Sequence, residues 1–347
     1  DMVSTTVTST FTNPAPVIDT ALGPQTAADS ETVSIPTMIS DPDGDELTYT
    51  VTGLPAGLLI DPDTGEITGV LDNSASQGGP NGDGVYVITV TADDGEGGTV
   101  TDTFELTVTN PGPEAVDDVN TASEDGTVTG NVIAGSDTDP DGDDLIVSEV
   151  GGDAANVGQP VAGTNGGLFT INADGTYTFD SNGEFEGLDV GETATTTITY
   201  QISDGEGGFS EATVTITVTG ENDAPVVDPA IPDQTGDDSA PLTPFDASAY
   251  FSDPDMEVNL FDLEGEPDWM SINPFTGEIT GTPPADASQG GPNGDGVYAV
   301  TIVATDQDGA ETRVTINYTI SNPAPTATDD NFVADEDGPA IAGNLIF

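Results

Sequence analysis

Short loops rich in aspartate are the part of this sequence best suited to chemistry. The pattern DPDGDEL occurs early, returns as DTDPDGDDL, and appears a third time as SDPDMEV, where Met256 replaces the glycine. The acids at alternate positions in these loops are Asp41, Asp43, Asp45, Asp137, Asp139, Asp141, Asp143, Asp253 and Asp255. Carboxylates spaced this way in a tight turn direct their oxygens to one point, where a cation would relieve their repulsion.

Two other acidic patterns recur along the chain. The loops ADDGEGG, SDGEGG and TDQDG lie between strand-like runs, and the tripeptide EDG occurs twice. The candidate ligands in these two patterns are Asp93, Asp94, Asp204, Asp306, Glu124, Asp125, Glu336 and Asp337. Acids that only solvate a surface would be scattered, so this grouping favours a binding role.

No lysine or histidine can neutralise these loops. The 347 residues include 64 acids and a single base, Arg313, which gives a formal net charge of −63. Such a charge excludes nucleic acid and anionic lipid as partners. Oxygen ligands in irregular loops suit Ca²⁺, which accepts about six to eight of them at roughly 2.3–2.6 Å, better than Mg²⁺. We therefore expect the chain to bind several calcium ions.

Other chemistries fit the sequence less well. DPDGDELTYTVTGL lacks the glycine and the glutamate that an EF-hand loop needs at its sixth and twelfth positions. Without Cys, His or Lys there is no disulfide, ordinary zinc site, Ser-His triad or Schiff base. Paired acids could serve a glycosidase, with carboxylates about 5 or about 6.5–9.5 Å apart, but pairs that recur in every unit favour a repeated metal site. We expect no enzyme activity.

A long internal repeat organises these loops. The twelve letters ASQGGPNGDGVY occur at Ala75 and again at Ala287, an offset of 212 that TGEITG, DPD and EDG share. The tetrapeptides NPAP, NPGP, NDAP and NPAP mark joints at Asn13, Asn110, Asn222 and Asn322. We therefore divide the chain into the last strand of a preceding domain (1–12), a type A domain (13–109), a type B domain (110–221), a second type A domain (222–321) and the start of a second type B domain (322–347).

Strands must position the acidic loops. In ATVTITVTG, Val214, Ile216 and Val218 alternate with threonines, and similar alternation precedes each joint. It also occurs at Val3 and Val7 in the opening segment. With Gly 43 and Pro 26 between short strands, this pattern predicts an all-β chain of tandem Ig-like or cadherin-like β-sandwiches.

The chain carries no membrane signal. No run approaches the about 18 apolar residues of a membrane span, so no membrane insertion is expected. The sequence also has no initial Met and no charged-then-apolar leader. We expect it to be an internal piece of a longer protein.

The order of these motifs resembles cadherin-like repeats. Type A is similar to the dystroglycan-type or “putative-Ig” cadherin-like module, most clearly in GLPAGLLIDPDTGEITG from Gly53 to Gly69. Type B resembles the VCBS-type repeat, in VDDVNTASEDGTVTGNVIAGSDTDPDGDDL and in YQISDGEGG. The resemblance implies the extended middle of a large secreted RTX-type adhesin on a bacterial cell surface, active in cell adhesion and biofilm formation.

The resemblance also implies where calcium would bind. In cadherin-like repeats the ions lie at the joint between successive domains, so the neighbouring domains of the same chain are the first partners. Carried over, the first complete joint uses Asp139, Asp141, Asp204 and the linker residue Asn110, with acids from the end of the first unit. The next joint uses Glu221, Asn222, Asp223, Asp253, Asp255 and Asp306.

Several alternatives stay open. A calcium-rigidified stalk that projects distal binding domains ranks first, a self-associating filament built by strand exchange second, and a glycan- or cell-binding module third. The duplicated loop GGPNGDG is interpreted as a turn rather than as a ligand-binding tip or a source of calcium ligands at Asp83 and Asp295. Trp269 is interpreted as a core residue, with Leu58 at or near the matching place, rather than as a sugar-stacking platform.

Overall fold

The chain folds almost entirely into β-strands. The computed structural model describes residues 12–256 and 259–325, and no α-helix occurs within those ranges. Residues 1–221 form one compact unit and residues 222–347 another. The predictions for Val3, Val7, Glu336 and Asp337 lie outside the described residues, as do most of the segments 1–12 and 322–347. No helix in the described part of the chain is long and apolar enough to cross a membrane.

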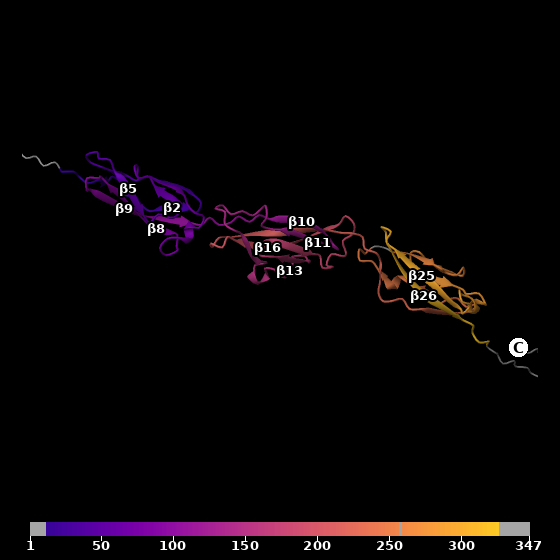
Figure 1. The fold of residues 1–347 in the computed structure, drawn as a ribbon. Helices are drawn as coiled ribbons and strands as arrows, with labels where there is room; N and C mark the ends of the chain where they lie inside the picture. The colour runs from indigo at the N-terminus through magenta and orange to yellow at the C-terminus, as the bar shows by residue number, and fades with distance from the viewer. Residues whose placement is uncertain (1–11, 257–258, 326–347) are drawn as a thin grey trace, which may run out of the picture. The chain divides into compact units, whose positions relative to one another are not determined.

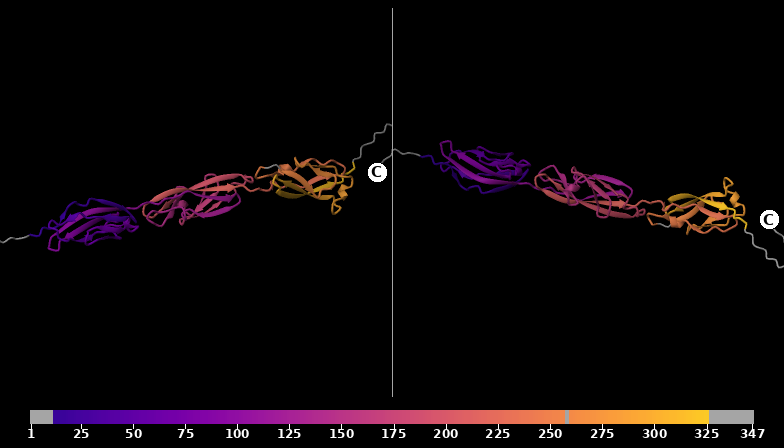
Figure 2. Two further views of the ribbon diagram at one scale, coloured as in Figure 1. Left: turned by 90° about the horizontal axis from the view of Figure 1, so that it is seen from above. Right: turned by 90° about the horizontal axis from the view of Figure 1, so that it is seen from below.

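The first sandwich packs a four-stranded sheet, β2-β9-β8-β5, against a three-stranded sheet, β3-β7-β6, and has a short β1-β4 pair (Figures 1 and 2). Its strands are β1 (Val17–Ile18), β2 (Gln25–Ala28), β3 (Thr32–Ile35), β4 (Ile39–Ser40), β5 (Thr48–Thr52), β6 (Leu58–Ile60), β7 (Ile67–Val70), β8 (Val85–Asp93) and β9 (Thr99–Thr109). A short 3₁₀ turn, η1 (Ala75–Gln77), precedes β8.

The second sandwich has two four-stranded sheets, β10-β17-β16-β12 and β11-β15-β14-β13. Its elements are β10 (Asp118–Ser123), β11 (Thr127–Asn131), β12 (Ile146–Val150), η2 (Ala154–Asn156), β13 (Pro160–Ala162), β14 (Leu168–Ile171), β15 (Thr176–Asp180), β16 (Thr193–Ser203) and β17 (Phe209–Thr219). It belongs to the same compact unit as the first sandwich.

The third sandwich, in the second unit, repeats the plan of the first. Its sheets are β19-β26-β25-β22 and β20-β24-β23, with a β18-β21 pair. Its elements are β18 (Val226–Val227), β19 (Gln234–Asp237), β20 (Phe245–Asp246), η3 (Ser248–Tyr250), β21 (Phe251–Ser252), β22 (Leu260–Glu264), β23 (Met270–Ile272), β24 (Glu278–Gly281), η4 (Ala287–Gln289), β25 (Val297–Thr305) and β26 (Glu311–Ser321).

Each sandwich has a hydrophobic core of its own, formed by the predicted alternation. Val214, Ile216 and Val218 on β17 are fully buried against the second core. The threonines between them face outward because successive side chains of a strand point to opposite faces. Thr89 and Thr103 pair across β8 and β9 through their hydroxyl groups at 3.1 Å. The sequence therefore predicted the fold class and the buried face correctly.

Trp269 packs against the third core, as predicted, with its ring edge-to-face on Tyr298 at 5.4 Å between centroids. The residue that takes the place of Leu58 is Met270, which is buried in the same way. Trp269 itself stands 212 residues after Gly57. The third sandwich thus fills with an aromatic ring a position where the first has no side chain.

The strand order gives every sandwich two ends with different loops. The β8–β9, β16–β17 and β25–β26 hairpin loops and the aspartate loop before β5, β12 or β22 lie at one end, which we call the entry end. The first edge strand of each main sheet runs parallel to the last strand, as in β2 with β9, β10 with β17 and β19 with β26. The turn after that edge strand therefore lies beside the end of the last strand, at what we call the exit end.

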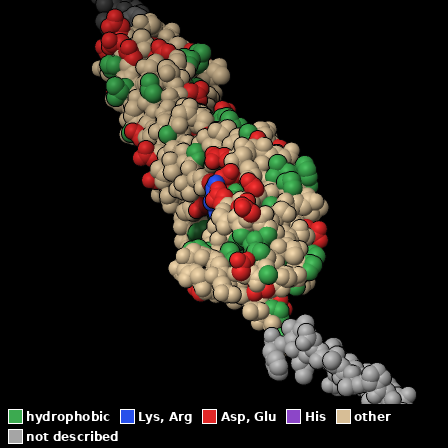
Figure 3. All heavy atoms as spheres, turned by 90° about the vertical axis from the view of Figure 1, so that its right-hand side faces the viewer, with side chains coloured by type: hydrophobic (Ala, Val, Ile, Leu, Met, Phe, Trp, Pro, Cys, Tyr) green, Lys and Arg blue, Asp and Glu red, His purple; other side chains and the backbone are tan. Residues whose placement is uncertain are grey.

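Arg313, the only basic residue of the chain, lies near the start of β26, an inner strand of the main sheet of the third sandwich. It pairs in register with Val303 on β25 and forms ion pairs with Glu311 and, at 3.6 Å, with Glu264. In Figure 3 this blue side chain lies among red carboxylates. Its backbone is therefore held in a sheet although its side chain is half-exposed.

Cleavage by trypsin should occur only when β26, the strand that carries Arg313, is unpaired from the sheet. The folded chain should resist trypsin, because a protease needs an extended, unpaired segment, and the unfolded chain should be cut only after Arg313. Mass spectrometry of a digest with and without urea should show two fragments in urea alone. Arg313→Gln is the control and should stay intact in both conditions. Rapid cutting of the native chain would contradict the strand pairing described here.

Candidate metal centre

An aspartate in the β16–β17 hairpin loop anchors the entry end of the second sandwich. Asp204 accepts hydrogen bonds through Oδ1 from the amides of Glu206 (2.7 Å) and Gly208 (2.9 Å). Its Oδ2 accepts from Asn110 Nδ2 of the linker at 2.8 Å. A Cβ on Gly208 would lie 2.0 Å from Asp204 Oδ2, so only glycine fits there. The hairpin and the joint asparagine are thus tied together, as the resemblance implies.

The same anchor recurs in the other two sandwiches. Asp94 Oδ2 accepts from Asn13 Nδ2 at 2.8 Å, and Asp306 Oδ2 accepts from Asn222 Nδ2 at 3.1 Å. Asn13 was treated in the sequence only as a joint marker. Its equivalence to Asn110 and Asn222 in the NPxP pattern was the available signal that it shares their role.

The aspartate loops are turns that fold around their first acid. Asp139 Oδ1 accepts from the amides of Asp141 (3.1 Å), Gly142 (3.1 Å) and Asp143 (3.3 Å). Gly142 has φ +89°, a left-handed conformation that glycine adopts without cost. This wrapping brings oxygens of Asp139, Asp141 and Asp143 within 4.8 Å of one another.

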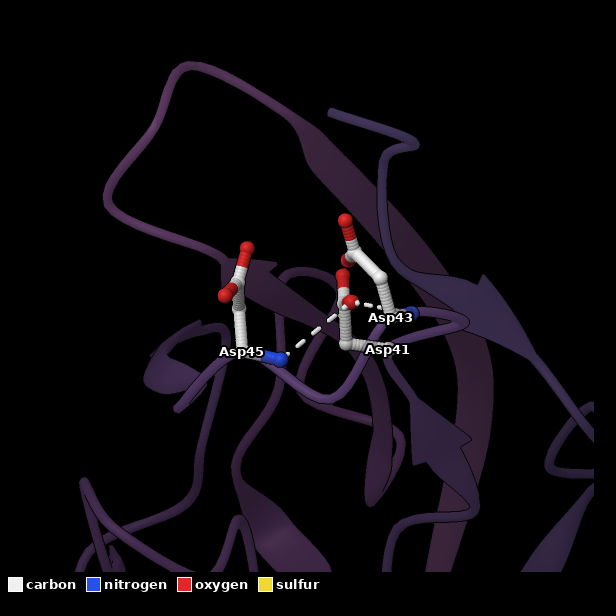
Figure 4. A group of neighbouring side chains, drawn as sticks. All are labelled: Asp41, Asp43 and Asp45. Carbon is white, nitrogen blue, oxygen red and sulfur yellow. Dashed lines mark hydrogen bonds between the residues drawn. The ribbon is translucent and has the colours of Figure 1, made fainter. Parts of the chain in front are cut away.

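The first sandwich has the same turn at Asp41, Asp43 and Asp45 (Figure 4). Asp41 Oδ1 accepts from the amides of Asp43 (3.0 Å) and Asp45 (3.4 Å), and the three carboxylates again lie within 4.8 Å. The carboxylate of Asp41, with burial and the charge of Asp45, raises the pKa of Asp43 to about 6. Negative charge is therefore crowded here as well.

The third sandwich keeps the turn but not its glycine. Asp253 Oδ1 accepts from the amide of Asp255 at 3.0 Å, and Met256 adopts φ +61° where Gly44 has +91°. The Met256 side chain is 86% exposed. A left-handed conformation costs a residue with a Cβ about 1–2 kcal/mol. This strain is the structural consequence of the substitution noticed in the sequence.

A third set of acids lies at the exit ends, in the turn after the first edge strand. The amides of Asp29, Glu124 and Asp238 donate to the last strand of their own sandwich, at Thr109, Thr219 and Ser321, over 2.9–3.0 Å. Glu124 was predicted, and its carboxylate accepts the amide of Glu221. Asp29 and Asp238 were missed. They stand 16 residues after Asn13 and Asn222, close to the 14 residues between Asn110 and Glu124, and this spacing was the usable signal.

The exit end of the first sandwich contacts the entry end of the second. Asn73 Nδ2 donates to Asp143 Oδ1 at 3.0 Å, and Ser30 Oγ donates to the backbone oxygen of Asp141 at 3.1 Å. Gln77 Nε2 donates to the backbone oxygen of Glu206 at 3.3 Å. Loops from two sandwiches, far apart in sequence, therefore share one site, which we call the joint site.

Oxygen atoms gather at the joint site without donors. Asp141 is only 9% exposed, and neither of its carboxylate oxygens has a hydrogen-bond partner in the described part of the chain. The other buried oxygens in the same situation are Asp29 Oδ2, Asn110 Oδ1, Asp139 Oδ2, Asp143 Oδ2 and Glu206 Oε2. Buried polar atoms are normally paired, and a buried charge without a counter-charge costs several kcal/mol.

Three carboxyl groups at the joint site have raised pKa values, as expected for buried acids that lie close together. Burial, followed by Asp139 and Asp143, raises the pKa of Asp141 to about 7. Burial and the charges of Asp139, Asp204 and Asp29 raise the pKa of Asp143. The pKa of Glu206 rises through burial and the charges of Asp143, Asp29 and Asp204. Carboxylates from both sandwiches thus repel one another.

A hard divalent cation fits this donor set. The converging atoms are carboxylate and amide oxygens from irregular loops, which match the ligands that Ca²⁺ accepts in variable geometry. Asp139, Asp141 and Asp143 offer oxygens within 4.8 Å of one another, and Asp29, Asn110 and Glu206 add buried oxygens that lack a donor in the described part of the chain. Asp204 already accepts hydrogen bonds but lies close enough for its charge to raise the pKa of Asp143. Mg²⁺ fits less well because it demands a near-ideal octahedron and keeps its water.

Not every predicted ligand faces such a group of oxygens. Asp137 is buried, but its carboxylate accepts the amide of Val116 at 2.8 Å and the hydroxyl of Tyr200, and burial raises its pKa. Asp93 caps its own loop through the amide of Gly95 at 2.8 Å. Asp125 is exposed. Asp137 therefore links the segment before β10, through Val116, to the core residue Tyr200 by hydrogen bonds.

The residues predicted for the next joint are divided between the two units. Glu221 belongs to the first unit, where it meets Glu124. In the second unit the amide of Asp223 donates to Asp255 Oδ2 at 2.8 Å. Asn222 Oδ1, Asp255 Oδ1 and Asn259 Oδ1 are buried with no partner among residues 222–256 and 259–325. Asn259 was not predicted, because no acidic motif marks it.

Comparison with known proteins gives two family matches that together span most of the chain. Residues 15–109 and 224–321 match the family described as “Putative Ig domain”, and residues 110–220 match “Bacterial cadherin-like domain”. No curated protein matches the chain.

Solved structures similar to the chain include cadherin ectodomains at low identity. Human desmocollin-1 is 15% identical over 89% of this chain and 62% of its own, with a TM-score of 0.36. Mouse cadherin-23 EC22-24 is 15% identical over 89% and 99%, with a TM-score of 0.38. Protocadherin gamma B2 domains 1-5 are 16% identical over 89% and 60%, with a TM-score of 0.40. The chain thus spans about 60% of the length of the first of these.

The strained turn of the third sandwich gives a direct test of the aspartate-loop geometry. Met256→Gly should raise the free energy of unfolding of the second unit by about 1 kcal/mol, because glycine removes the left-handed strain at a small cost in unfolded-state entropy. Trp269, the single tryptophan, lies in that unit, so its fluorescence in a urea titration measures this change alone. Met256→Ala, which keeps the Cβ, is the matched control. Equal stabilisation by both variants would contradict the strain.

Proposed function

The chain belongs to the “Putative Ig domain” family, with a “Bacterial cadherin-like domain” between its two Ig copies, and from this premise we propose that it is a calcium-rigidified stalk. In this proposal it forms part of an RTX-type adhesin on a bacterial cell surface and holds distal binding domains away from the cell. Its role is mechanical, in cell adhesion and biofilm formation, and it needs no catalytic residue.

One observation carries the proposal: the buried carboxylate of Asp141 has no donor for either oxygen within the described residues, at a site built from two sandwiches. A structure that folded for solvation alone would leave these oxygens in water. Packing these charged oxygens together is costly unless a cation binds among them. The absence of any lysine or histidine leaves a metal ion as the natural cation.

The ion would act as a link between domains. Asp29 would hold it from the first sandwich, Asn110 from the linker, and Asp141 and Asp204 from the second. The bound ion supplies positive charge and converts mutual repulsion into attraction. Each domain then contributes ligands to the same ion, so bending the joint would break metal–ligand bonds. Because ligand binding stabilises only the state that has the site, calcium should also stabilise the fold.

The acidic surface supports the same role. With a net charge of −63, successive domains repel each other over about 8–10 Å at physiological salt. Calcium at the joints would lower this charge where it opposes alignment most. A cytoplasm poor in calcium would leave the joints open, and the medium outside the cell would close them.

A second candidate, self-association through strand pairing, rests on strand β10. This strand pairs only with β17, and its Val119 side chain is 82% exposed. An edge strand with an exposed apolar residue can pair with another chain. Electron microscopy would reveal filaments in that case and separate particles in the case of a stalk.

Calcium removal tests the stalk directly. In EGTA the scattering profile should show a flexible chain, and saturating Ca²⁺ should change the radius of gyration and raise the melting temperature. A ligand at about 100 times its Kd stabilises by about 2.7 kcal/mol per site. Mg²⁺ at the same concentration is the control and should have a smaller effect. If neither quantity responds to calcium, the proposal fails.

The variant Asp141→Asn should stabilise the fold in the absence of calcium and destabilise it in the presence of calcium. The pKa of Asp141 in the folded, cation-free chain, about 7, lies above its ordinary value of 3.8. Stability in EGTA should therefore fall as pH rises between those values, and the neutral asparagine should remove part of this loss. At pH 8 we expect the variant to be about 1 kcal/mol more stable in EGTA and about 1 kcal/mol less stable in calcium.

Hydrogen exchange of the β16–β17 amides would measure this change in the second sandwich. Asp93→Asn removes an acid that only caps its own loop, and it should show no reversal. An Asp141→Asn variant that is destabilised in both conditions would mean that the carboxylate has a structural role without a metal.

A further inference from the structure

The duplicated loop before β8 and β25 has so far been given no function. We call residues 71–84 and 283–296 the first and second latch loops. The twelve letters from Ala75 to Tyr86 recur without change, whereas the strand that follows reads VITVTAD in one copy and AVTIVAT in the other. This twelve-residue identity therefore ends at the start of the strand.

Both latch loops are fixed in one conformation by the same internal contacts. Tyr86 donates its hydroxyl to the backbone oxygen of Ala75 at 2.8 Å, and Tyr298 donates to Ala287 at 3.0 Å. A Cβ on Gly78 would lie 2.0 Å from the Tyr86 hydroxyl. The residue that closes each 3₁₀ turn has φ −91° in both copies, with ψ −157° and −156°. The two loops thus share one backbone conformation from Ala75 and Ala287 onward.

The first latch loop is in contact with the second sandwich. Asn73 and Gln77 donate side-chain hydrogen bonds to Asp143 and to the backbone of Glu206. The loop also orients its own exit-end turn, because the amide of Ser76 donates to Asp29 Oδ1 at 2.8 Å. The neighbouring Ser30, at φ +59°, donates to the backbone of Asp141. These three contacts between the sandwiches join protein groups directly.

The second latch loop has the same arrangement at the exit end of the third sandwich. The amide of Ser288 donates to Asp238 Oδ1 at 2.7 Å, and Ser239 has φ +60°. Gln289 takes the place of Gln77, while Ala285 takes the place of Asn73. The second latch loop region therefore keeps two of the three donor residues of the first, a serine (Ser239 for Ser30) and a glutamine (Gln289 for Gln77), with similar backbone geometry.

We propose that the latch loops dock the following cadherin-like domain by direct hydrogen bonds, and that the second loop is a preformed surface for another domain of the same type as residues 110–221. The choice of occupant follows from the first loop, which is seated on such a domain within one compact unit. It also follows from the sequence after β26, where NPAP at Asn322 repeats the NPGP linker of that domain. A turn alone would not need Gln77 or Ser30 to face a neighbour.

Spin labels across the first joint test the latch without metal. The chain has no cysteine, so Thr50→Cys and Thr178→Cys, both exposed on strands, place one label in each sandwich. In EGTA the distance distribution should contain a docked population. In Asn73→Ala with Gln77→Ala, its ratio to the undocked population should fall about fivefold for each hydrogen bond lost. Calcium should restore docking in both chains.

The control variant is Gln289→Ala, which changes the second latch loop and should leave this distance unchanged. A wild-type distribution in EGTA as broad as that of the double variant would overturn direct docking. Because this comparison is made without calcium, it can contradict direct docking and leave the calcium proposal intact. In the same way, a failure of the calcium proposal would leave direct docking intact.

The second latch loop is tested by adding the isolated cadherin-like domain, residues 110–221, which has a hydrophobic core of its own. Added in EGTA at about millimolar concentration, the weakest regime that a few hydrogen bonds give, it should shift the amide resonances of Ser239, Ser288 and Gln289 in the isotopically labelled chain. The domain 222–321 should shift them less. No shift, or equal shifts with both domains, would overturn the assignment of the occupant.

Discussion

This structure depends on one constraint, the mutual repulsion of carboxylates that no neighbouring basic residue neutralises. Asp139 folds its loop by accepting three backbone amides, which brings Asp141 and Asp143 beside it. The fold then adds Asp204 and Glu206 from a hairpin and Asp29 from another sandwich. The hydrogen bonds that order these loops thus bring negative charges together, and in the proposed function a bound cation offsets their repulsion.

The sandwiches are suited to this task because their topology separates two kinds of loop. Antiparallel hairpins place the aspartate loops at the entry end, and the parallel edge strand places a turn with two acids at the exit end. One acid from an exit end can then complete a set that an entry end leaves open. The latch loop adds neutral donors next to these acids, so that recognition between domains need not depend on charge alone.

The third sandwich has the same fold as the first but differs from it at several residues around the site. It keeps the anchoring pair of Asn222 and Asp306 and the exit-end Asp238. It replaces a turn glycine by Met256 at a cost in backbone strain, and fills the place of Gly57 with Trp269. Its outer face carries Arg313 among acids, where the first sandwich has threonines. The hydrogen-bonded framework of the site is thus kept while the surfaces around it differ.

The sequence by itself determined the sandwiches, their buried faces and the aspartate loops, because strand alternation and tight turns are set by residues close together in the chain. Asp139 and Asp141 could be grouped for that reason, and Asp204 was placed with them only through the resemblance to cadherin-like repeats. Only the tertiary structure decided that Asp29 joins them and that Asp137 turns inward to Tyr200. Asp29 lies in none of the acidic motifs, and Asp143, whose pKa its charge raises, is more than 100 residues away. Which isolated acid meets a distant loop depends on how strands pair and on which end of a sandwich each turn occupies, and local sequence does not encode that.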